Sequence, residues 1–219
     1  MTGTAAFSTV VREGTRSVHE DSEGSSFIAD LMGGSGTLDD YTALVSQLFF
    51  LYTALEAAGE HFVHEPDAAR FISPALLRID AISADLRFLL GPNWREQITP
   101  LSATDRYVAR LGEIVRSHSV SEFVAHHYTR YLGDLSGGQI IRTLLQRQFG
   151  FDSAGVAFYL FEHIDKPKVF KDNYRLQLDS LSWTDSERQS MINEVVVAFR
   201  LNTAMFVGLA EATAAAAAR

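Results

Sequence analysis

The chain has 219 residues, of which 47% are hydrophobic and 21% charged, and it contains no cysteine. This length and composition indicate one globular domain with a substantial core, and the lack of cysteine excludes disulfides and thiolate metal ligands. The formal net charge of -8 argues against general nucleic-acid binding, which needs a basic surface.

Two further features bear on location and domain organisation. No apolar run approaches the length needed to span a bilayer, and residues 1–8 lack the charged and apolar regions of a signal peptide. We therefore expect a cytoplasmic monomer without a membrane anchor. We expect residues 1–211 to form one domain and residues 212–219 to be an alanine-rich tail without evident chemistry.

The first predicted helix covers residues 5–22 and carries two stripes at helical spacing. The apolar stripe consists of Phe7, Val11, Gly14 and Val18, and the polar stripe consists of Arg12, Arg16, His19 and Glu23. A carboxylate one turn after a histidine can hold one ring nitrogen and leave the other to bind a metal. For an isolated pair, however, the pattern favours a solvated helix end with charge pairs.

The next three predicted helices look like scaffold. After a glycine-rich turn at residues 33–36, a strongly apolar helix is predicted over residues 38–61. A third helix is expected to begin at Pro74 and end at Gly91, and a fourth to begin near residues 102–104. The histidines near their ends, which we expect at the surface, are His61, His64 and His118.

Residues 126–139 combine helical periodicity with glycines at positions 133, 137 and 138. Each glycine costs a helix about 1 kcal/mol relative to alanine, so a bend is expected here. Gly133 and Gly137 share one face, which could admit either a flat ligand or a neighbouring helix, and spacing alone slightly favours the helix. His126 and His127 point about 100° apart, which favours packing over a shared metal.

The C-terminal third begins with residues 154–161, for which a loop or a short helix is predicted. Pro167 opens a helix on which Lys171 and Arg175 stand four apart; together they could hold a dianion, although alone they would indicate solvated charge. Thr184 and Glu187 form a capping box that opens the last helix. Its apolar stripe contains Asn202, which implies a buried amide that needs partners. The chain is therefore predicted to be all-α, with about seven or eight helices.

Taken together, these residues would suit a planar iron macrocycle with carboxylate substituents. One helix offers His19, another offers a flat glycine face with the carboxylate of Asp134, and basic side chains on other helices could hold anionic groups. This argument is compatible with haem without singling it out.

Residues 128–139, YTRYLGDLSGGQ, closely resemble the distal-helix signature of haem oxygenases. Four shorter segments resemble other parts of that family and occur in the right order. They are Thr15-x-x-Val18-His19-x-x-x-Glu23, Tyr52-x-Ala54-Leu55-Glu56, Phe170-Lys171-x-x-Tyr174-Arg175 and Phe199-x-x-Asn202-x-x-x-Phe206. The resemblance spans about residues 7 to 209, and it favours the ligand interpretation of His19, Glu23 and the glycines.

The resemblance implies a single all-α domain in which haem b lies between a proximal helix and a glycine-bent distal helix. His19 would bind the iron and Glu23 would hold its imidazole. The backbone at Gly133, Gly137 and Gly138 would meet the other haem face. Asp134 would order the water that delivers a proton to bound dioxygen, and its network would include Tyr52, Thr129, Arg130 and Asn202. The implied propionate contacts are Arg12, Tyr128, Lys171 and Arg175, and the implied pocket lining is Phe199 and Phe206.

The reaction implied by the resemblance is cleavage of haem at the α-meso carbon to biliverdin, carbon monoxide and ferrous iron. Haem would be both cofactor and substrate, dioxygen the co-substrate, and the electrons would come from a soluble donor such as ferredoxin or flavodoxin with its reductase. The alternative is a haem carrier or sensor on the same fold, against which Asp134 argues. Family members often have lysine where Arg12 stands, and the planar guanidinium of arginine replaces a compact ammonium donor there. Because propionate contacts help to set which meso edge meets the bound oxygen, this difference bears on the choice of meso edge.

Overall fold

The computed structural model describes residues 5–217, and every regular element among them is a helix. Eleven α-helices and three 3-10 turns occur in this range, where the sequence predicted seven or eight helices. They are α1 (Phe7–Gly14), α2 (Arg16–Glu23), α3 (Ser26–Gly33), α4 (Leu38–Phe62), α5 (Pro66–Ala69), η1 (Pro74–Leu76), α6 (Ile79–Leu90), η2 (Trp94–Glu96), α7 (Ser102–Ser117), α8 (Val120–Asp134), α9 (Gly137–Phe149), η3 (Ala157–Tyr159), α10 (Pro167–Asp179) and α11 (Asp185–Ala217). The all-α prediction is confirmed.

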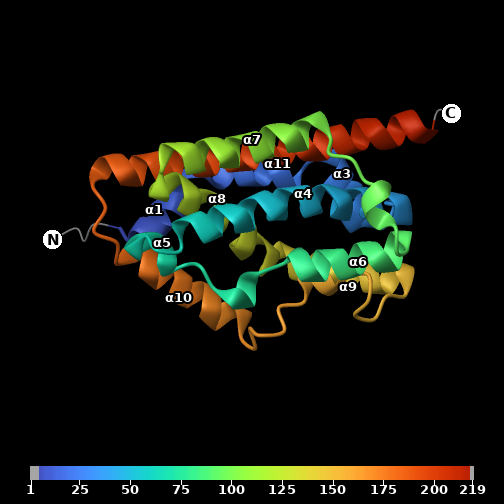
Figure 1. The fold of residues 1–219 in the computed structure, drawn as a ribbon, viewed down its shortest axis with the longest axis horizontal. Coiled ribbons are helices and arrows are strands. Elements are labelled where there is room, and N and C mark those ends of the chain that lie inside the picture. The colour runs from blue at the N-terminus through green and yellow to red at the C-terminus, as the bar shows by residue number, and fades with distance from the viewer. Residues whose placement is uncertain (1–4, 218–219) are drawn as a thin grey trace.

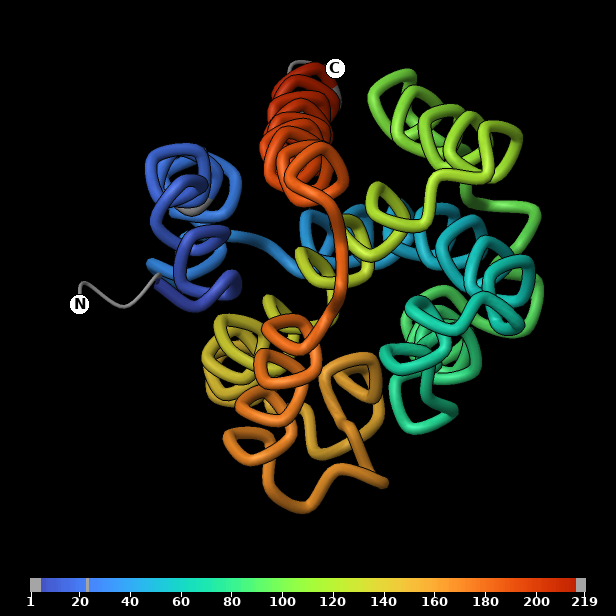
Figure 2. Tube along the Cα trace, turned by 90° about the vertical axis from the view of Figure 1, so that its left-hand side faces the viewer, coloured from blue at the N-terminus to red at the C-terminus, as the bar shows by residue number. Residues whose placement is uncertain are grey.

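The helices are arranged around α4, which runs through the middle of the molecule. In Figure 1, α7 and α11 lie above α4, and α6 and α9 lie below it. Figure 2 shows the N-terminal helices grouped on one side of the molecule. Of these, α2 and α3 contact α11, whereas α1 also contacts α10 and α3 also contacts α9. The N-terminal helices therefore face both the last helix and the helices that follow the glycine-rich stretch.

The two longest helices begin at capping boxes. Thr37 and Asp40 satisfy each other's backbone N–H groups at the start of α4. Thr184 and Glu187 do the same before α11, with Thr184 N donating to Glu187 Oε2 at 2.8 Å and Glu187 N donating to Thr184 Oγ1 at 3.3 Å. The predicted start of the last helix is thus confirmed, and α4 matches its predicted range to within one residue.

Two helix predictions were wrong. The single helix expected over residues 5–22 is divided at the buried Thr15, whose backbone leaves helical geometry, with φ -115° and ψ 8°. The helix expected to begin at Pro74 begins at Ile79, because Leu77 is extended, with φ -57° and ψ 133°. Pro74 instead opens the turn η1. The short helices α3 and α5 were not predicted.

The bend predicted in the glycine-rich stretch is a complete break. Helix α8 ends at Asp134 and α9 begins at Gly137. Between them Ser136 leaves helical geometry, with φ -121° and ψ -93°. Its hydroxyl donates to Leu132 O at 2.7 Å and so partners a carbonyl of the last turn of α8.

The alanine-rich tail continues α11 as far as Ala217, and Thr213 within it donates to Asp40 Oδ1 at 2.7 Å. The domain limit at residue 211 stays a prediction. Within the described residues, α11 is also long and apolar enough over Asp185–Ala215 to cross a membrane by length and composition alone, contrary to the expectation from the sequence. The same helix buries Met191, Val195 and Met205 in the core.

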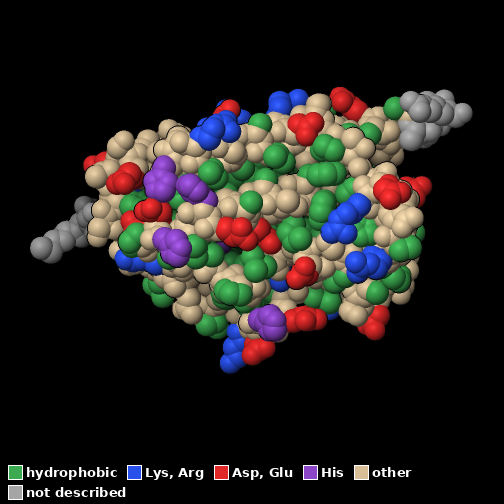
Figure 3. Space-filling view, in the orientation of Figure 1, with side chains coloured by type: hydrophobic (Ala, Val, Ile, Leu, Met, Phe, Trp, Pro, Cys, Tyr) green, Lys and Arg blue, Asp and Glu red, His purple; other side chains and the backbone are tan. Residues whose placement is uncertain are grey.

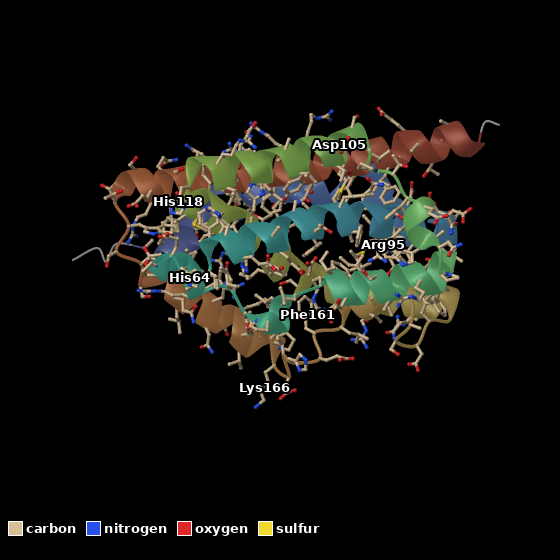
Figure 4. All side chains as sticks on the ribbon, viewed as in Figure 1. His64, Arg95, Asp105, His118, Phe161 and Lys166 are labelled. Atoms are coloured by element: carbon tan, nitrogen blue, oxygen red, sulfur yellow. The ribbon has the colours of Figure 1, made fainter. Side chains whose placement is uncertain are left out.

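The histidines divide as predicted into surface and core. In Figure 3 most of the visible histidine side chains lie at one end of the molecule, where Figure 4 labels His64 and His118, and another lies at the lower edge. His118 is the left-handed C-cap of α7, with φ 53°. His126 and His127 are both buried in the core, which confirms the packing interpretation.

Candidate functional site

Two adjoining cavities lie between α2, the α8–α9 break and α11. The inner cavity has a volume of about 140 Å³ and the outer one of about 460 Å³. Both are lined by the same five residues, which are His19, Thr129, Gly133, Gly137 and Phe199. They therefore form one site, with the predicted proximal helix on one side and the predicted distal helix on the other.

The glycines play two different parts in the distal wall. A Cβ atom added at Gly133 or at Gly137 would meet nothing within 4 Å, so the backbone borders open space at both positions. At Gly138 an added Cβ would lie 3.0 Å from Tyr159 Cδ1. Close packing therefore explains Gly138, whereas Gly133 and Gly137 keep the cavity open.

The opposite wall is made by α2 and α11. The ring of His19 meets that of Phe199 edge to face, with 5.2 Å between the ring centroids. Asn202 and Phe206, on the same face of α11, line the inner cavity. The side chain of Glu23 lies outside the described residues, so its predicted pairing with His19 stays a prediction.

A buried polar network stands beside the glycines. Asp134 is only 6% exposed, and its Oδ2 accepts a hydrogen bond from the hydroxyl of Tyr52. Arg130 donates to Asp134 Oδ1 at 3.4 Å and to Asn202 Oδ1 at 3.0 Å. Its Nε also donates to the Tyr52 hydroxyl oxygen at 3.3 Å. The oxygen of the buried Asn202 amide therefore has a partner, as the sequence predicted.

The surroundings of this network alter its acidity. Burial raises the pKa of Asp134 above its ordinary value, although the charge of Arg130 and the hydrogen bond from Tyr52 act in the opposite direction. Burial also raises the pKa of Tyr52 well above its ordinary value, so this phenol stays neutral. A carboxyl group with a raised pKa beside a cavity is suited to taking up and releasing a proton.

Cationic side chains gather at the outer cavity. Arg12, Arg16 and Arg175 line it together with Tyr128. Lys171 does not line it, but its Nζ donates at 2.7 Å to the hydroxyl of Ser136, which does. Arg175 also pairs with Asp172 Oδ1 at 3.1 Å. This end of the site can therefore hold anionic groups.

Several lining residues were not predicted from the sequence. The inner cavity is closed by apolar side chains from α3, α4, α9 and η3, which are Ile28, Leu44, Leu48, Ile141, Phe158 and Tyr159. Nothing local distinguishes these residues from ordinary core residues. For residues 154–161 the sequence predicted only a loop or a short helix, without a place in the site.

The comparisons agree with the motif. The family model described as Heme oxygenase matches residues 5–207. Heme oxygenase 1 of Pongo abelii is 38% identical over 207 residues, which cover 93% of this chain and 72% of the relative. Heme oxygenase 1 of Synechocystis is 35% identical over 196 residues, which cover 90% of this chain and 81% of the relative.

Solved structures give the same result. The crystal structure of heme oxygenase-1 from the cyanobacterium Synechocystis in complex with heme is similar with a TM-score of 0.89 and 32% identity, over 97% of this chain and 98% of that one. The structure of heme oxygenase from Leptospira interrogans has a TM-score of 0.87 and 34% identity, over 92% and 98% of the two chains. Motif, fold and relatives agree, and the chain belongs to the haem oxygenase family.

Proposed function

We propose that the joined cavities hold one haem b between His19 and the α8–α9 break, with His19 as the iron ligand. As a haem oxygenase, the chain is an enzyme that degrades haem, and haem is both its cofactor and its substrate. The observation that carries the site assignment is the open backbone at Gly133 and Gly137, which faces the same cavity as His19.

The residues present fit the group. A Cβ at Gly133 or Gly137 would occupy the space that a flat ring needs. The outer cavity carries arginines, whereas the inner cavity is bordered by apolar side chains such as Ile28 and Leu44. Haem has the same division, with propionates at one edge and methyl and vinyl groups at the other, so the two patterns match.

Asp134 is proposed to order the water that delivers the proton that the reaction consumes. Bound haem supplies the iron that activates dioxygen and the ring that is opened, with electrons from an external donor. Tyr52 and Arg130 fix the carboxyl group, and Asn202 fixes the guanidinium. Burial raises the pKa of Asp134, which favours proton exchange at the cavity wall, and Phe199 and Phe206 exclude bulk water.

The cations of the outer cavity are proposed to orient the substrate. Arg12, Arg175 and the hydroxyl of Tyr128 line this end, and Lys171 can exchange its bond to Ser136 for one to a propionate. Holding the propionates there would place the α-meso edge toward Asp134, giving biliverdin, carbon monoxide and ferrous iron. The planar guanidinium of Arg12 can form two parallel hydrogen bonds to one carboxylate, which supports a contact with a propionate.

The remaining proposals concern partners and location. The cationic outer rim, on a chain with a net charge of -8, supports docking of an acidic electron donor such as ferredoxin or flavodoxin, supplied by its reductase. The contacts of α11 with α2, α3, α7 and α8 support packing of this helix within the domain over a membrane anchor. We therefore propose a cytoplasmic monomer.

The first test is titration with haemin, followed by absorption in the Soret region. The wild type and His64→Ala, a change at an exposed histidine outside the site, should give the same ligand-bound spectrum. His19→Ala should give a different one, because the iron loses its protein ligand. Identical spectra for all three proteins would overturn the ligand assignment.

The second test separates an oxygenase from a carrier or sensor. The haemin-loaded wild type is supplied with reductant and dioxygen, and the product is followed by absorption and chromatography. An oxygenase converts the haem to biliverdin. A carrier would retain it unchanged, which would overturn the proposed reaction.

A further inference from the structure

The inner end of the cavity is closed by η3, a single 3-10 turn. Phe158 and Tyr159 from this turn line the inner cavity. One turn of this kind has too few internal hydrogen bonds to fix its own position. The position of the inner wall therefore depends on the side chains that hold η3 from outside.

Asp85 of α6 holds the turn through its backbone donors. Its side chain is 0% exposed, Oδ1 accepts from Ala157 N at 2.9 Å, and Oδ2 accepts from Phe158 N at 2.8 Å. Burial raises the pKa of Asp85 to about 6, although these backbone hydrogen bonds act to lower it. Each carboxylate oxygen accepts a hydrogen bond from a different backbone N–H group of η3, so both oxygens hold this turn in place.

Arg78, at the start of α6, holds the same segment through its carbonyl groups. Its Nη1 donates to Phe158 O at 3.1 Å and to Leu160 O at 2.6 Å. The guanidinium also lies 4.0 Å from the ring centroid of Phe161, a residue labelled in Figure 4. Asp85 thus binds the N–H groups of this segment and Arg78 binds its carbonyl groups, and both side chains come from the α6 side.

Gln139 joins the turn to the distal helix break from the other side. Its Nε2 donates to Tyr159 O at 2.9 Å and to Asp134 O at 3.1 Å. The ring of Tyr159 also packs at Gly138, where an added Cβ would be 3.0 Å away. Gln139 therefore fixes the position of the inner wall relative to the backbone of Asp134.

We propose that Asp85, acting with Arg78 and Gln139, is a positioning residue that determines which meso edge of the haem faces Asp134. The proposal rests on the proposed haem site. A porphyrin ring turned in its own plane presents a different meso carbon at each quarter turn. The cationic rim restrains the propionate edge, and the wall of Phe158 and Tyr159 restrains the opposite edge. If the wall is displaced, a second orientation becomes accessible.

The test uses Asp85→Asn with Asp80→Asn as the matched control. The asparagine NH2 group opposes one of the two N–H groups of η3, so one hydrogen bond is lost. Asp80 lies on the same helix but is exposed. In Asp85→Asn the biliverdin isomers that are minor in the wild type should rise by up to about ten-fold relative to the main isomer. Asp80→Asn should give the wild-type composition.

A second readout does not depend on turnover. Proton NMR of the haemin-loaded ferric protein resolves the haem methyl groups, and a second orientation of the haem adds a second set of methyl signals. That set should be prominent in Asp85→Asn and remain at the wild-type level in Asp80→Asn. A single unchanged set, together with an unchanged isomer composition, would overturn the inference.

Gln139→Leu provides an independent variant for the case in which Asp85→Asn does not fold, as judged by circular dichroism. It removes the donor to Tyr159 O from a half-buried surface position, and the same two changes are expected. If neither change occurs in a folded Gln139→Leu protein, the inference is wrong. If the wild type binds haemin but forms no biliverdin, the proposed reaction fails, whereas the orientation is still decided by NMR.

Discussion

Asp134 combines two properties that proton delivery requires. Its carboxyl group is fixed by Tyr52 and Arg130, and burial raises its pKa. A group that held its proton too weakly would be ionised throughout, and a group that could move would lose its position relative to the substrate. The role proposed for Asp134 therefore depends on its neighbours as much as on its own chemistry.

Replacing Asp134 should separate binding from turnover. In Asp134→Ala and Asp134→Asn, haemin should still bind with a near-normal Soret band, because His19 is unchanged. The biliverdin yield should fall by at least about 100-fold, since neither side chain can donate a carboxyl proton, and peroxide should be diverted to unproductive oxidation. Asp134→Asn preserves the shape of the side chain and so controls for packing. Normal biliverdin formation in both variants would exclude the proton-delivery role.

At the scale of the element, the break between α8 and α9 places three glycines in different environments. Gly133, one residue before the end of α8, is exposed and borders open space, whereas Gly138 packs against the ring of Tyr159. The same substitution should therefore have opposite effects on stability at these two positions.

Gly133→Ala should stabilise the protein and weaken haem binding. Alanine favours the helix by about 1 kcal/mol over glycine, but its Cβ enters the cavity. Gly138→Ala should instead lower the unfolding free energy by about 1–3 kcal/mol, because the Tyr159 ring must shift. Denaturant unfolding and haemin titration of both variants provide the measurements. If Gly133→Ala binds haemin as tightly as the wild type, the backbone at Gly133 does not border the ring.

The elements that could be predicted from the sequence are those with strong local signals. The capping box at Thr184 and Glu187 and the long apolar pattern of α4 gave their positions correctly. The divide at Thr15 and the short helices α3 and α5 depend on packing between distant segments, which periodicity does not reveal. The extended backbone of Leu77, after η1, is likewise not revealed by periodicity.

For the site, the sequence was informative where the chemistry is unusual. Glycines within a helical pattern and a histidine on a charged stripe stand out from ordinary core residues, and the structure brings them to one cavity. Ile28, Phe158 and Tyr159 carry no such signal, because an apolar residue lining a pocket has the same character as one in the core. Asp85 and Arg78 were missed because their partners are backbone atoms far away in the chain.

At the scale of the whole molecule, a second buried network joins α7, α8 and α11. Glu194 accepts from Arg110 Nε at 2.9 Å, and its Oε1 lies 2.8 Å from Nε2 of His126. Burial alone would raise the pKa of Glu194, but hydrogen bonds from His126 and Arg110 lower it to about 2. Burial lowers the pKa of His126, although the hydrogen bond to Glu194 and the charge of that carboxylate act to raise it.

This network should contribute to acid stability. Because the folded pKa of Glu194 lies below its ordinary value of 4.5, its contribution is present above about pH 4.5 and is lost as the pH falls through 2. Glu194→Gln should therefore be less stable than the wild type by on the order of 3 kcal/mol at pH 7, and the difference should shrink between pH 4.5 and 2. Urea unfolding across this pH range measures it.

Glu113→Gln is the matched control. Glu113 also pairs with Arg110, at 3.3 Å, but its side chain is 54% exposed, so its contribution should be small. A difference between the wild type and Glu194→Gln that did not change with pH would show that the carboxylate of Glu194 is not the stabilising group.

The position of α11 has a consequence for the order in which the protein can fold during synthesis. The ribosome delivers the N-terminal helices first, yet α2 and α3 pack against α11, and His19 meets Phe199 near the end of the chain. The start of α4 likewise receives its contact from Thr213 only when the C-terminal part of α11 has emerged. A nascent chain that stops before Asp185 lacks one wall of the site. The proposed haem site is therefore complete only after α11 has been synthesised.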